Sequence, residues 1–189
     1  MPDADWWQAL WPDPGKIITE MGVPPGRIVI DLCCGDGLFT APLSRVADRV
    51  YAIDIDPAML DRARTRLTAM GVSNCQFMVA DAMVLDTLVS EAVDYVFLAN
   101  TFHGVPDQVG LARTVAAKIK PGGQFGIVNW HRRPREETVV LGKPRGPKTE
   151  MRMEPEDVIA AGEAVGLLHK HIIELPPYHY GVVLERRNA

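Results

Sequence analysis

The sequence predicts an α/β fold, with a doubly wound, mostly parallel seven-stranded sheet that ends in an antiparallel hairpin. Two observations favour this fold. Strand-like apolar runs alternate with helical patterns from residue 27 to residue 130, which is typical of a parallel sheet covered by helices on both faces. Near the C-terminus, two strand-like runs follow each other directly, and consecutive strands joined in this way pair antiparallel.

The predicted elements follow from hydrophobic spacing and from turn signals such as Gly71 and the Pro-Gly-Gly of residues 121–123. Asp56 and Pro57 suit the cap and first position of a helix whose buried stripe includes Met59, Leu60 and Met70. In chain order we expect strands over residues 28–32, 50–54, 75–79, 95–99, 124–130, 168–175 and 178–186, and helices over residues 38–46, 57–70, 107–119 and 155–165.

Length and composition indicate one domain over residues 1–189. The net charge of −4 argues against nucleic acid or an anionic membrane as a partner, and no apolar run is long enough to cross a bilayer. Three cysteines, two of them adjacent, form neither a disulfide framework nor a metal-binding pattern. Because the acidic N-terminus does not resemble a signal peptide, we expect a reduced, cytoplasmic protein without a metal.

The first predicted strand and the turn after it, residues 27–40, organise the rest of the chain. The strand is apolar except for Asp31, which lies near the edge of an α/β sheet where ligands bind. Gly35 and Gly37 allow a sharp turn and the close approach of a ligand to main-chain N–H groups. The stretch resembles motif I of the class I S-adenosylmethionine (SAM)-dependent methyltransferases, with Cys33 in place of the first glycine of that motif.

Three acids, Asp31, Asp54 and Asp81, end three successive predicted strands. The resemblance implies that each binds one polar group of SAM. Asp31 would hold the ammonium, Asp54 the two ribose hydroxyls, and Asp81 the exocyclic amine of the adenine. It also implies that Ile55 lies against the adenine and that the Ala82 N–H reads a ring nitrogen.

The remaining candidate cofactor residues are Cys33, Gly35, Gly37 and Asn100. Cys33 is better interpreted as a small buried residue than as a nucleophile, since nothing in the sequence marks an activating base beside it. Asn100 follows the fourth strand, at a position where members of the family place residues beside the transferred methyl group. Asp31 could instead cap the turn that follows it.

Catalytic candidates are fewer. His103 and Tyr178 are the residues that we favour, and His131, His179 and Tyr180 are weaker alternatives. In a strand, Tyr178 and Tyr180 share one face and His179 takes the other. His103 could be a wall of the active site or a general base. Many enzymes of this family need no base, because the cofactor carries the reactive group.

Two segments flank the predicted site. Residues 1–26 form a predicted helical cover, in which Trp6, Trp7, Leu10 and Trp11 have helical spacing; they either cover the core or close over the cofactor. Whether the chain forms a homodimer through these tryptophans stays open. Residues 131–153 lack periodicity and carry seven basic against three acidic side chains, a net charge of +4. This long segment is either a lid or substrate loop or a solvated basic loop.

The resemblance implies a SAM-dependent methyltransferase that methylates an unidentified small molecule by in-line displacement. The alternative is a non-catalytic, SAM-binding subunit that supports a partner. An enzyme that methylates DNA bases or glutamine amides is disfavoured, because Asn100 is not followed by a proline pair. A nicotinamide-dependent enzyme is disfavoured because Thr40 stands where its third glycine or alanine is needed.

Overall fold

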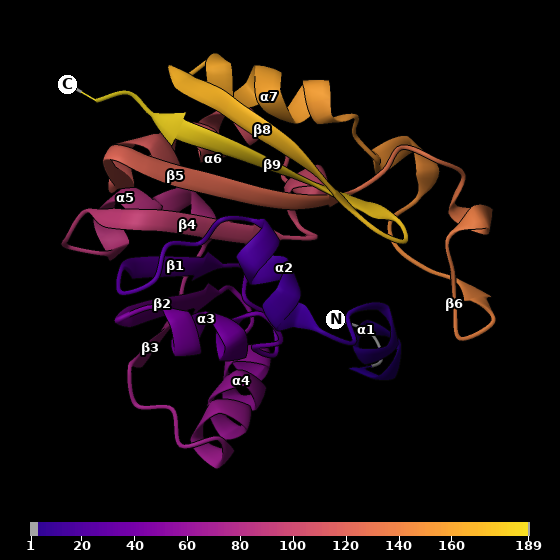
Figure 1. Cartoon of the computed structure of the whole chain (residues 1–189), viewed down its shortest axis with the longest axis horizontal. Helices are drawn as coiled ribbons and strands as arrows, with labels where there is room; N and C mark the ends of the chain where they lie inside the picture. Colours follow the sequence, from indigo (N-terminus) through magenta and orange to yellow (C-terminus); the bar gives the residue numbers. More distant parts are fainter. Residues whose placement is uncertain (1–3, 189) are drawn as a thin grey trace.

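A seven-stranded sheet forms the middle layer of the protein, and helices cover both of its faces (Figure 1). The computed structural model describes residues 4–188, so residues 1–3 of the predicted cover and residue 189 lie outside the described part. The strand order is β3-β2-β1-β4-β5-β9-β8. The strands are β1 (Ile28–Leu32), β2 (Arg49–Asp54), β3 (Cys75–Val79), β4 (Val93–Ala99), β5 (Ile119–Trp130), β8 (Leu167–Leu175) and β9 (His179–Arg186).

The first five strands in this order pair in parallel, whereas β9 pairs antiparallel with both β5 and β8. The predicted parallel sheet with an antiparallel C-terminal hairpin is therefore confirmed. Parallel pairing brings the carboxyl ends of β1, β2, β3, β4 and β5 to one edge of the sheet, where ligands bind in open α/β folds.

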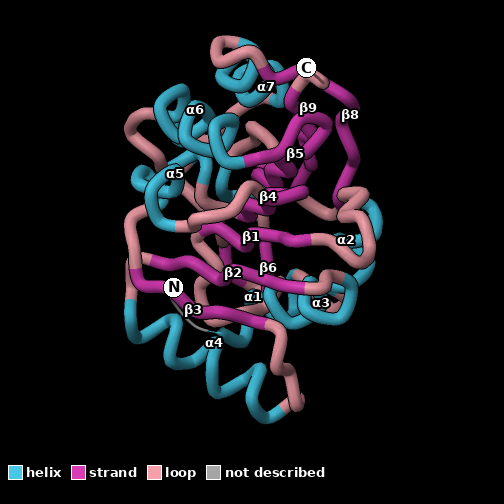
Figure 2. Tube along the Cα trace, turned by 90° about the vertical axis from the view of Figure 1, so that its left-hand side faces the viewer, coloured by secondary structure: helices cyan, strands magenta, loops and turns pink. Residues whose placement is uncertain are grey.

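The helices divide between the two faces (Figure 2). One face carries α5 (Leu85–Leu88), α6 (Gln108–Lys118) and α7 (Pro155–Glu163), and the other carries α1 (Ala4–Leu10), α2 (Pro14–Glu20), α3 (Thr40–Val46) and α4 (Pro57–Ala69). Alternate residues of each strand point to opposite faces. In β1, Ile30 therefore packs with the α6 side, whereas Val29 packs with the α3 side.

Some boundaries differ from those expected. The Pro-Gly-Gly turn at residues 121–123 does not separate a helix from a strand but bulges out of β5. Ile119 pairs with Val93 and Gln124 with Tyr95, so the residues between them leave the ladder and return to it. Met70, expected in the buried stripe of α4, is exposed because the helix ends one residue before it.

Residues 131–153 fold into short ordered elements rather than an open loop. They contain two short 3₁₀ turns, η3 (Arg135–Glu137) and η4 (Thr149–Met151), on either side of a small hairpin formed by β6 (Val139–Val140) and β7 (Lys143–Pro144). Thr138 and Arg152 are buried inside the segment, where Arg152 Nη2 donates to Thr138 Oγ1 at 2.8 Å. The segment packs against α1, next to which β6 lies in Figure 1.

Within residues 4–188, no helix has both the length and the apolar character needed to cross a membrane.

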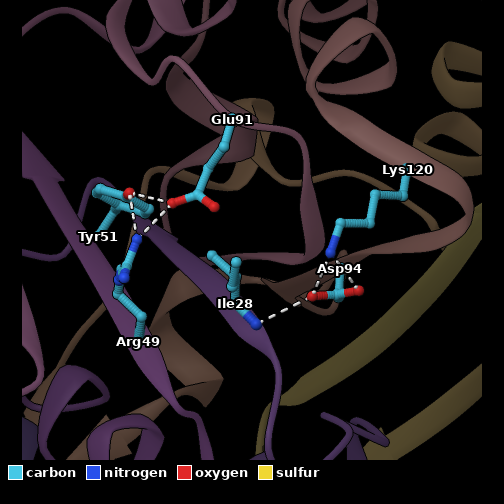
Figure 3. Close-up of polar contacts among 6 residues, drawn as sticks. All are labelled: Ile28, Arg49, Tyr51, Glu91, Asp94 and Lys120. Atoms are coloured by element: carbon cyan, nitrogen blue, oxygen red, sulfur yellow. Dashed lines mark hydrogen bonds and ion pairs between the residues drawn. The ribbon is translucent and has the colours of Figure 1, made fainter.

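Polar contacts join the strands at the edge of the sheet opposite to the predicted site (Figure 3). Asp94 Oδ2 accepts from the Ile28 backbone N–H at 3.0 Å, and Lys120 Nζ donates to both oxygens of Asp94 at 2.9 and 3.0 Å. Partial burial pushes the pKa of Asp94 upward, but the bonds from Ile28 and Lys120 outweigh it and hold that pKa below its ordinary value. Asp94 thus links β1, β4 and the bulge of β5.

We expect Asp94→Ala to lower the free energy of unfolding by about 1–3 kcal/mol, since it leaves the Ile28 N–H and Lys120 without their acceptor. Because the pKa of Asp94 is lowered by folding, this contribution is present above the carboxyl's ordinary pKa of about 3.8 and is lost as the pH falls through the folded value. Denaturant unfolding measures this contribution of Asp94 to the free energy of unfolding. The surface pair of Arg49 and Glu91 is the control, and Glu91→Gln should have the smaller effect.

Candidate active site

A cavity of about 390 Å³ opens at the carboxyl edge of the sheet, between the ends of β1, β2, β3 and β4. Five residues of the predicted cofactor site line it: Cys33, Asp54, Ile55, Asp81 and Ala82. The remaining wall is largely apolar. The structure therefore brings together side chains that are separated by up to about 50 positions in the sequence, because successive parallel strands end side by side.

Backbone N–H groups hold Asp54, the last residue of β2. Gly35 N donates to its Oδ2 at 2.8 Å, and Asp56 N donates to its Oδ1 at 2.9 Å. Each oxygen keeps a second lone pair that can accept from a ligand hydroxyl. Two adjacent ribose hydroxyls match a carboxylate fixed in this way.

Ile55 gives the cavity an apolar surface that the protein leaves uncovered. Its side chain is 66% exposed although it follows directly after a buried strand, which is unusual for so large an apolar residue. Met83, Val105 and Pro106 line the same cavity. Apolar side chains around an uncovered isoleucine suit a flat ring such as adenine.

Asp81 stands where the loop after β3 turns into η1 (Ala82–Val84). Its Oδ1 accepts from Met83 N at 2.9 Å, so it caps this turn, while its Oδ2 has no hydrogen bond within the described part of the chain. That oxygen remains able to accept from an exocyclic amine.

A smaller chamber of about 100 Å³ shares Cys33 and Thr101 with the larger cavity. Asp31, Asn100 and Trp7 also line it. Two of its polar atoms, Asn100 Oδ1 and Trp7 Nε1, are buried and have no hydrogen-bond partner among residues 4–188. Buried polar groups are rarely left unpaired, so an unpaired acceptor and an unpaired donor on residues that line this chamber suit a ligand with an ammonium and a carboxylate.

Asp31 is the acid of this chamber. It is buried, and Thr40 Oγ1 at the start of α3 donates to its Oδ2 at 2.6 Å. Burial, only partly offset by the bond from Thr40, raises the pKa of Asp31 to about 7, and the nearby charge of Asp54 adds to the effect. A carboxyl in this state gains from a cationic partner, since the partner supplies the counter-charge that the protein lacks.

The backbone is left-handed at two non-glycine residues beside this chamber. Cys33 has φ of 59° and Asn100 has φ of 60°, a region that costs a residue with a Cβ roughly 1–2 kcal/mol. Cys33 occupies the position of the first glycine in motif I, so this φ explains why glycine is usual there. Burial, reinforced by Asp54, raises the pKa of the Cys33 thiol to about 12, which keeps it protonated and poorly nucleophilic.

Gly37 serves packing rather than the cavity wall. A Cβ at this position would lie 3.0 Å from Ala63 Cβ and 3.2 Å from Leu67 Cδ1 of α4, and the φ of Gly37 is +81°. We therefore expect Gly37→Ala to destabilise the protein by about 1–3 kcal/mol, measured as a fall in the free energy of unfolding. Gly22→Ala has a similar φ but open space around its Cβ, so it should cost less.

The comparisons with known proteins identify the family. A methyltransferase-domain family model matches residues 29–123, from β1 to the bulge of β5. This chain belongs to the class I SAM-dependent methyltransferases. A crystal structure of a SAM-dependent methyltransferase from Aquifex aeolicus superposes with a TM-score of 0.78 over 97% of this chain and 93% of that chain; at 23% identity, it supports the fold alone.

Curated relatives of this methyltransferase have different names. It is 29% identical over 160 residues to a ubiquinone biosynthesis O-methyltransferase of Stutzerimonas stutzeri. The match covers 79% of this chain and 68% of the relative. It is 28% identical over 123 residues to a demethylmenaquinone methyltransferase of Lactococcus lactis, covering 64% of this chain and 46% of the relative. A Mycobacterium bovis protein is 26% identical over 114 residues, and the match spans only 41% of its length.

A third chamber of the methyltransferase, of about 220 Å³, adjoins the small one through Trp7 and Asn100. His103 from η2 (Phe102–Gly104) lines it, together with Trp130 at the end of β5 and residues of the 131–153 segment. The structure therefore places the catalytic candidate His103 next to the chamber that suits the methionine end of SAM.

Asn129 fixes the proton on His103. Asn129 Oδ1 accepts from the Trp130 backbone N–H at 3.1 Å and lies 2.9 Å from His103 Nδ1. A backbone N–H can only donate, so the atom that faces it is the amide oxygen, and His103 Nδ1 must then carry the hydrogen. This tautomer leaves the lone pair on Nε2. Burial lowers the pKa of His103, which keeps the ring neutral near pH 7 despite the hydrogen bond that Nδ1 donates to Asn129 Oδ1.

The other catalytic candidates have structural partners. Tyr178 stacks on Trp130 and its hydroxyl donates to Val139 O at 3.0 Å, and it lines none of the three chambers described above. Tyr180 donates to Met153 O at 3.0 Å. His131 pairs with Glu174 at the surface. His179 is fully buried between Trp11 and Trp130, and burial lowers its pKa far below the ordinary value.

Sequence reasoning did not single out Asn129 or Thr40 as parts of the site, and it named Trp7 only as part of a helical cover that could close over the cofactor. Asn129 carried a usable signal, because it is the one amide in the otherwise apolar run that ends β5, and such a side chain needs a partner when buried. Of the predicted residues, Gly35 and Gly37 line none of the three chambers; Gly35 acts through its bond to Asp54. No group of three or more His, Cys, Asp or Glu within residues 4–188 could hold a metal ion.

Proposed function

We propose that this protein transfers a methyl group from SAM to a small-molecule acceptor. The observation that carries the proposal is a row of three chambers that share lining residues and differ in chemistry. The first suits a nucleoside, the second has the unpaired atoms that an amino-acid end requires, and the third adjoins the second at Asn100. The names of the curated relatives support a small-molecule acceptor.

When bound, SAM supplies a methyl group on a positively charged sulfur, which departs as a neutral thioether. The residues of this chain bind and orient. Asp54 and Asp81 would hold the nucleoside, and Asp31 and Asn100 the ammonium. His103 Nε2 would accept the proton of an acceptor hydroxyl or amine as its oxygen or nitrogen bonds to the methyl carbon. Trp6, Trp7 and Trp130 limit the access of water to the third chamber.

Calorimetry with S-adenosylhomocysteine, the demethylated product, tests the cofactor site. We expect binding by the wild type and a loss of about 10–100-fold in affinity for Asp54→Ala, because the carboxylate then no longer accepts from the ribose hydroxyls. Asp86→Ala removes an exposed acid and is the matched control. Equal affinities for Asp54→Ala and the wild type would contradict the assignment.

Transfer itself is tested with SAM labelled on its methyl group and the small-molecule fraction of a bacterial extract. We expect label in a small product with the wild type and, at SAM concentrations below the Kd of the variant, about 10–100-fold less with Asp54→Ala. Binding of S-adenosylhomocysteine without any transfer would instead favour a non-catalytic, SAM-binding subunit. A cytoplasmic location and a homodimer stay predictions that this experiment does not address.

A further inference from the structure

The third chamber combines aromatic walls with basic side chains. Trp6 and Trp7 stack on each other with ring centroids 4.2 Å apart, and both lie 6.4 Å from the ring of Trp130. Arg135 and Arg145 line the same chamber. Among residues 4–188, no aspartate or glutamate lines it, which is the reverse of the two acid-lined chambers for the cofactor.

A buried guanidinium group lies behind one of these aromatic walls. Arg152 is only 3% exposed, and its guanidinium lies 5.2 Å from the centre of the Trp130 ring. Its hydrogen bonds go to neutral oxygens, those of Pro147, Thr138 and Arg145. Its Nη1 is buried without a partner, and it forms no ion pair with a carboxylate in the described part of the chain.

Arg135 adds a second charge that its surroundings do not neutralise. Its Nε donates to Gly146 O at 3.1 Å, and its two Nη groups have no hydrogen bond or ion pair within residues 4–188. Burial and the charges of Arg135 and Arg133 lower the pKa of Arg152, and Glu136 offsets only part of this. The Nη groups of Arg135 therefore remain able to bind an anion, because guanidinium binds carboxylate and phosphate in a paired geometry.

The aromatic walls alone would also fit a cation, since tryptophan faces attract ammonium groups. Here guanidinium groups already lie over two of these rings, Arg145 over Trp6 at 5.4 Å and Arg152 over Trp130. A cationic acceptor would therefore meet the charge of Arg152 behind the ring of Trp130 and that of Arg135 in the chamber wall. A volume of about 220 Å³ is below the roughly 300–1,000 Å³ of sites for drug-sized ligands, which favours an acceptor of one or two rings.

We propose that the acceptor is a small planar acid, whose ring lies against the tryptophans and whose carboxylate is bound by Arg135, with the buried charge of Arg152 behind the ring of Trp130. This inference rests on the proposed function and adds the class of acceptor to it. A carboxylate held at the basic end directs the ring toward Asn100 and His103, where the chamber adjoins the cofactor site.

Binding of matched probes tests the proposal. Tryptophan fluorescence is titrated with 4-hydroxybenzoate, 4-hydroxybenzamide and 4-hydroxybenzylamine, and with the corresponding hydroxynaphthalene acid, amide and amine, in the presence of S-adenosylhomocysteine. We expect the better-fitting acid to bind about 10–100-fold more tightly than its amide, the range for hydrogen bonds to charged groups, and the amine to bind most weakly.

Arg135→Gln should remove most of the acid's advantage, whereas Arg135→Lys should keep part of it. Arg132→Gln makes the same change of charge at an exposed position in the same segment and should leave the advantage intact. The proposal is overturned if no acid binds more tightly than its amide, if an amine binds best, or if Arg132→Gln and Arg135→Gln weaken the acid equally.

Calorimetry with S-adenosylhomocysteine alone separates this inference from the proposed function. If the cofactor product binds but the acids show no Arg135-dependent preference, the acceptor class is wrong and the cofactor site stands. If the acids bind as expected while S-adenosylhomocysteine does not, the anion site stands and the proposed function falls.

Discussion

Asp31→Asn is expected to stabilise the free protein at about pH 8 and, at the same time, to weaken its binding of S-adenosylhomocysteine. Asp31 is buried with Thr40 as its hydrogen-bond donor, and its pKa rises from 3.8 to about 7 on folding. A pKa that rises by about 3 on folding corresponds to a cost on the order of 4 kcal/mol for holding the ionised form of Asp31 in the folded protein. Asparagine removes this cost, but it also removes the charge that would face the ammonium.

The sign of the pH dependence follows from proton binding. Below about pH 3.8 both folded and unfolded states carry the proton, so Asp31 costs nothing. Between about 3.8 and 7 the unfolded chain releases the proton while the folded protein keeps it, so stability falls as the pH rises. Above about pH 7 the full cost remains. The variant and the wild type should therefore match near pH 4 and diverge up to about pH 7.

Thermal unfolding across this pH range measures the effect, and calorimetry measures the loss of affinity. Asp86→Asn, which removes an equal charge at an exposed position, should follow the wild type throughout. A variant that melts below the wild type at about pH 8 would show that the charged form of Asp31 stabilises the free protein, against the argument made from its burial.

His103→Ala is expected to slow methyl transfer at saturating SAM by about 10²–10⁴-fold, the usual contribution of a general base. Affinity for S-adenosylhomocysteine should change little, because His103 lines the third chamber and not the two cofactor chambers. The rate of label transfer to the small-molecule extract is the measurement. His171→Ala, an exposed histidine of β8, is the control.

The variant Asn129→Asp tests whether His103 acts as a general base or only lines the chamber. A carboxylate beside His103 Nδ1 favours the protonated ring and raises its pKa. The rate of methyl transfer by the wild type should decline only below about pH 6.5, since the pKa of His103 is already lowered. In Asn129→Asp, the decline of this rate should move to higher pH by about one unit or more. An unchanged pH profile would exclude His103 as the base.

The sequence predicted the sheet, and the meeting of three acids at one edge of it, because both depend on local signals. Each parallel strand is a short apolar run, and Asp31, Asp54 and Asp81 lie at or just after the ends of three of them. Once the strands pair in parallel, topology alone brings these acids to one edge. No knowledge of side-chain packing is needed for that step.

The acceptor side could not be predicted in the same way, because its residues meet through long-range packing. The bond of His103 to Asn129 joins η2, which follows β4, to the end of β5, and the contact of Trp7 with Trp130 joins α1 to the last residue of β5. The burial of Arg152 depends on a hairpin, β6–β7, that shows no hydrophobic period. Spacing along the chain carries no trace of these contacts.

The stacking of Trp6 and Trp7 beside Trp130 has a consequence for how the protein is made. The helix α1 is synthesised first, but it packs against β5 and the β6–β7 hairpin. It therefore cannot complete its packing until both have been synthesised. The lining of the 390 Å³ cavity lies within residues 33–107, whereas the third chamber also needs Trp130 and residues up to Pro147. The walls of the third chamber can therefore come together only after the whole lining of the larger cavity has been synthesised.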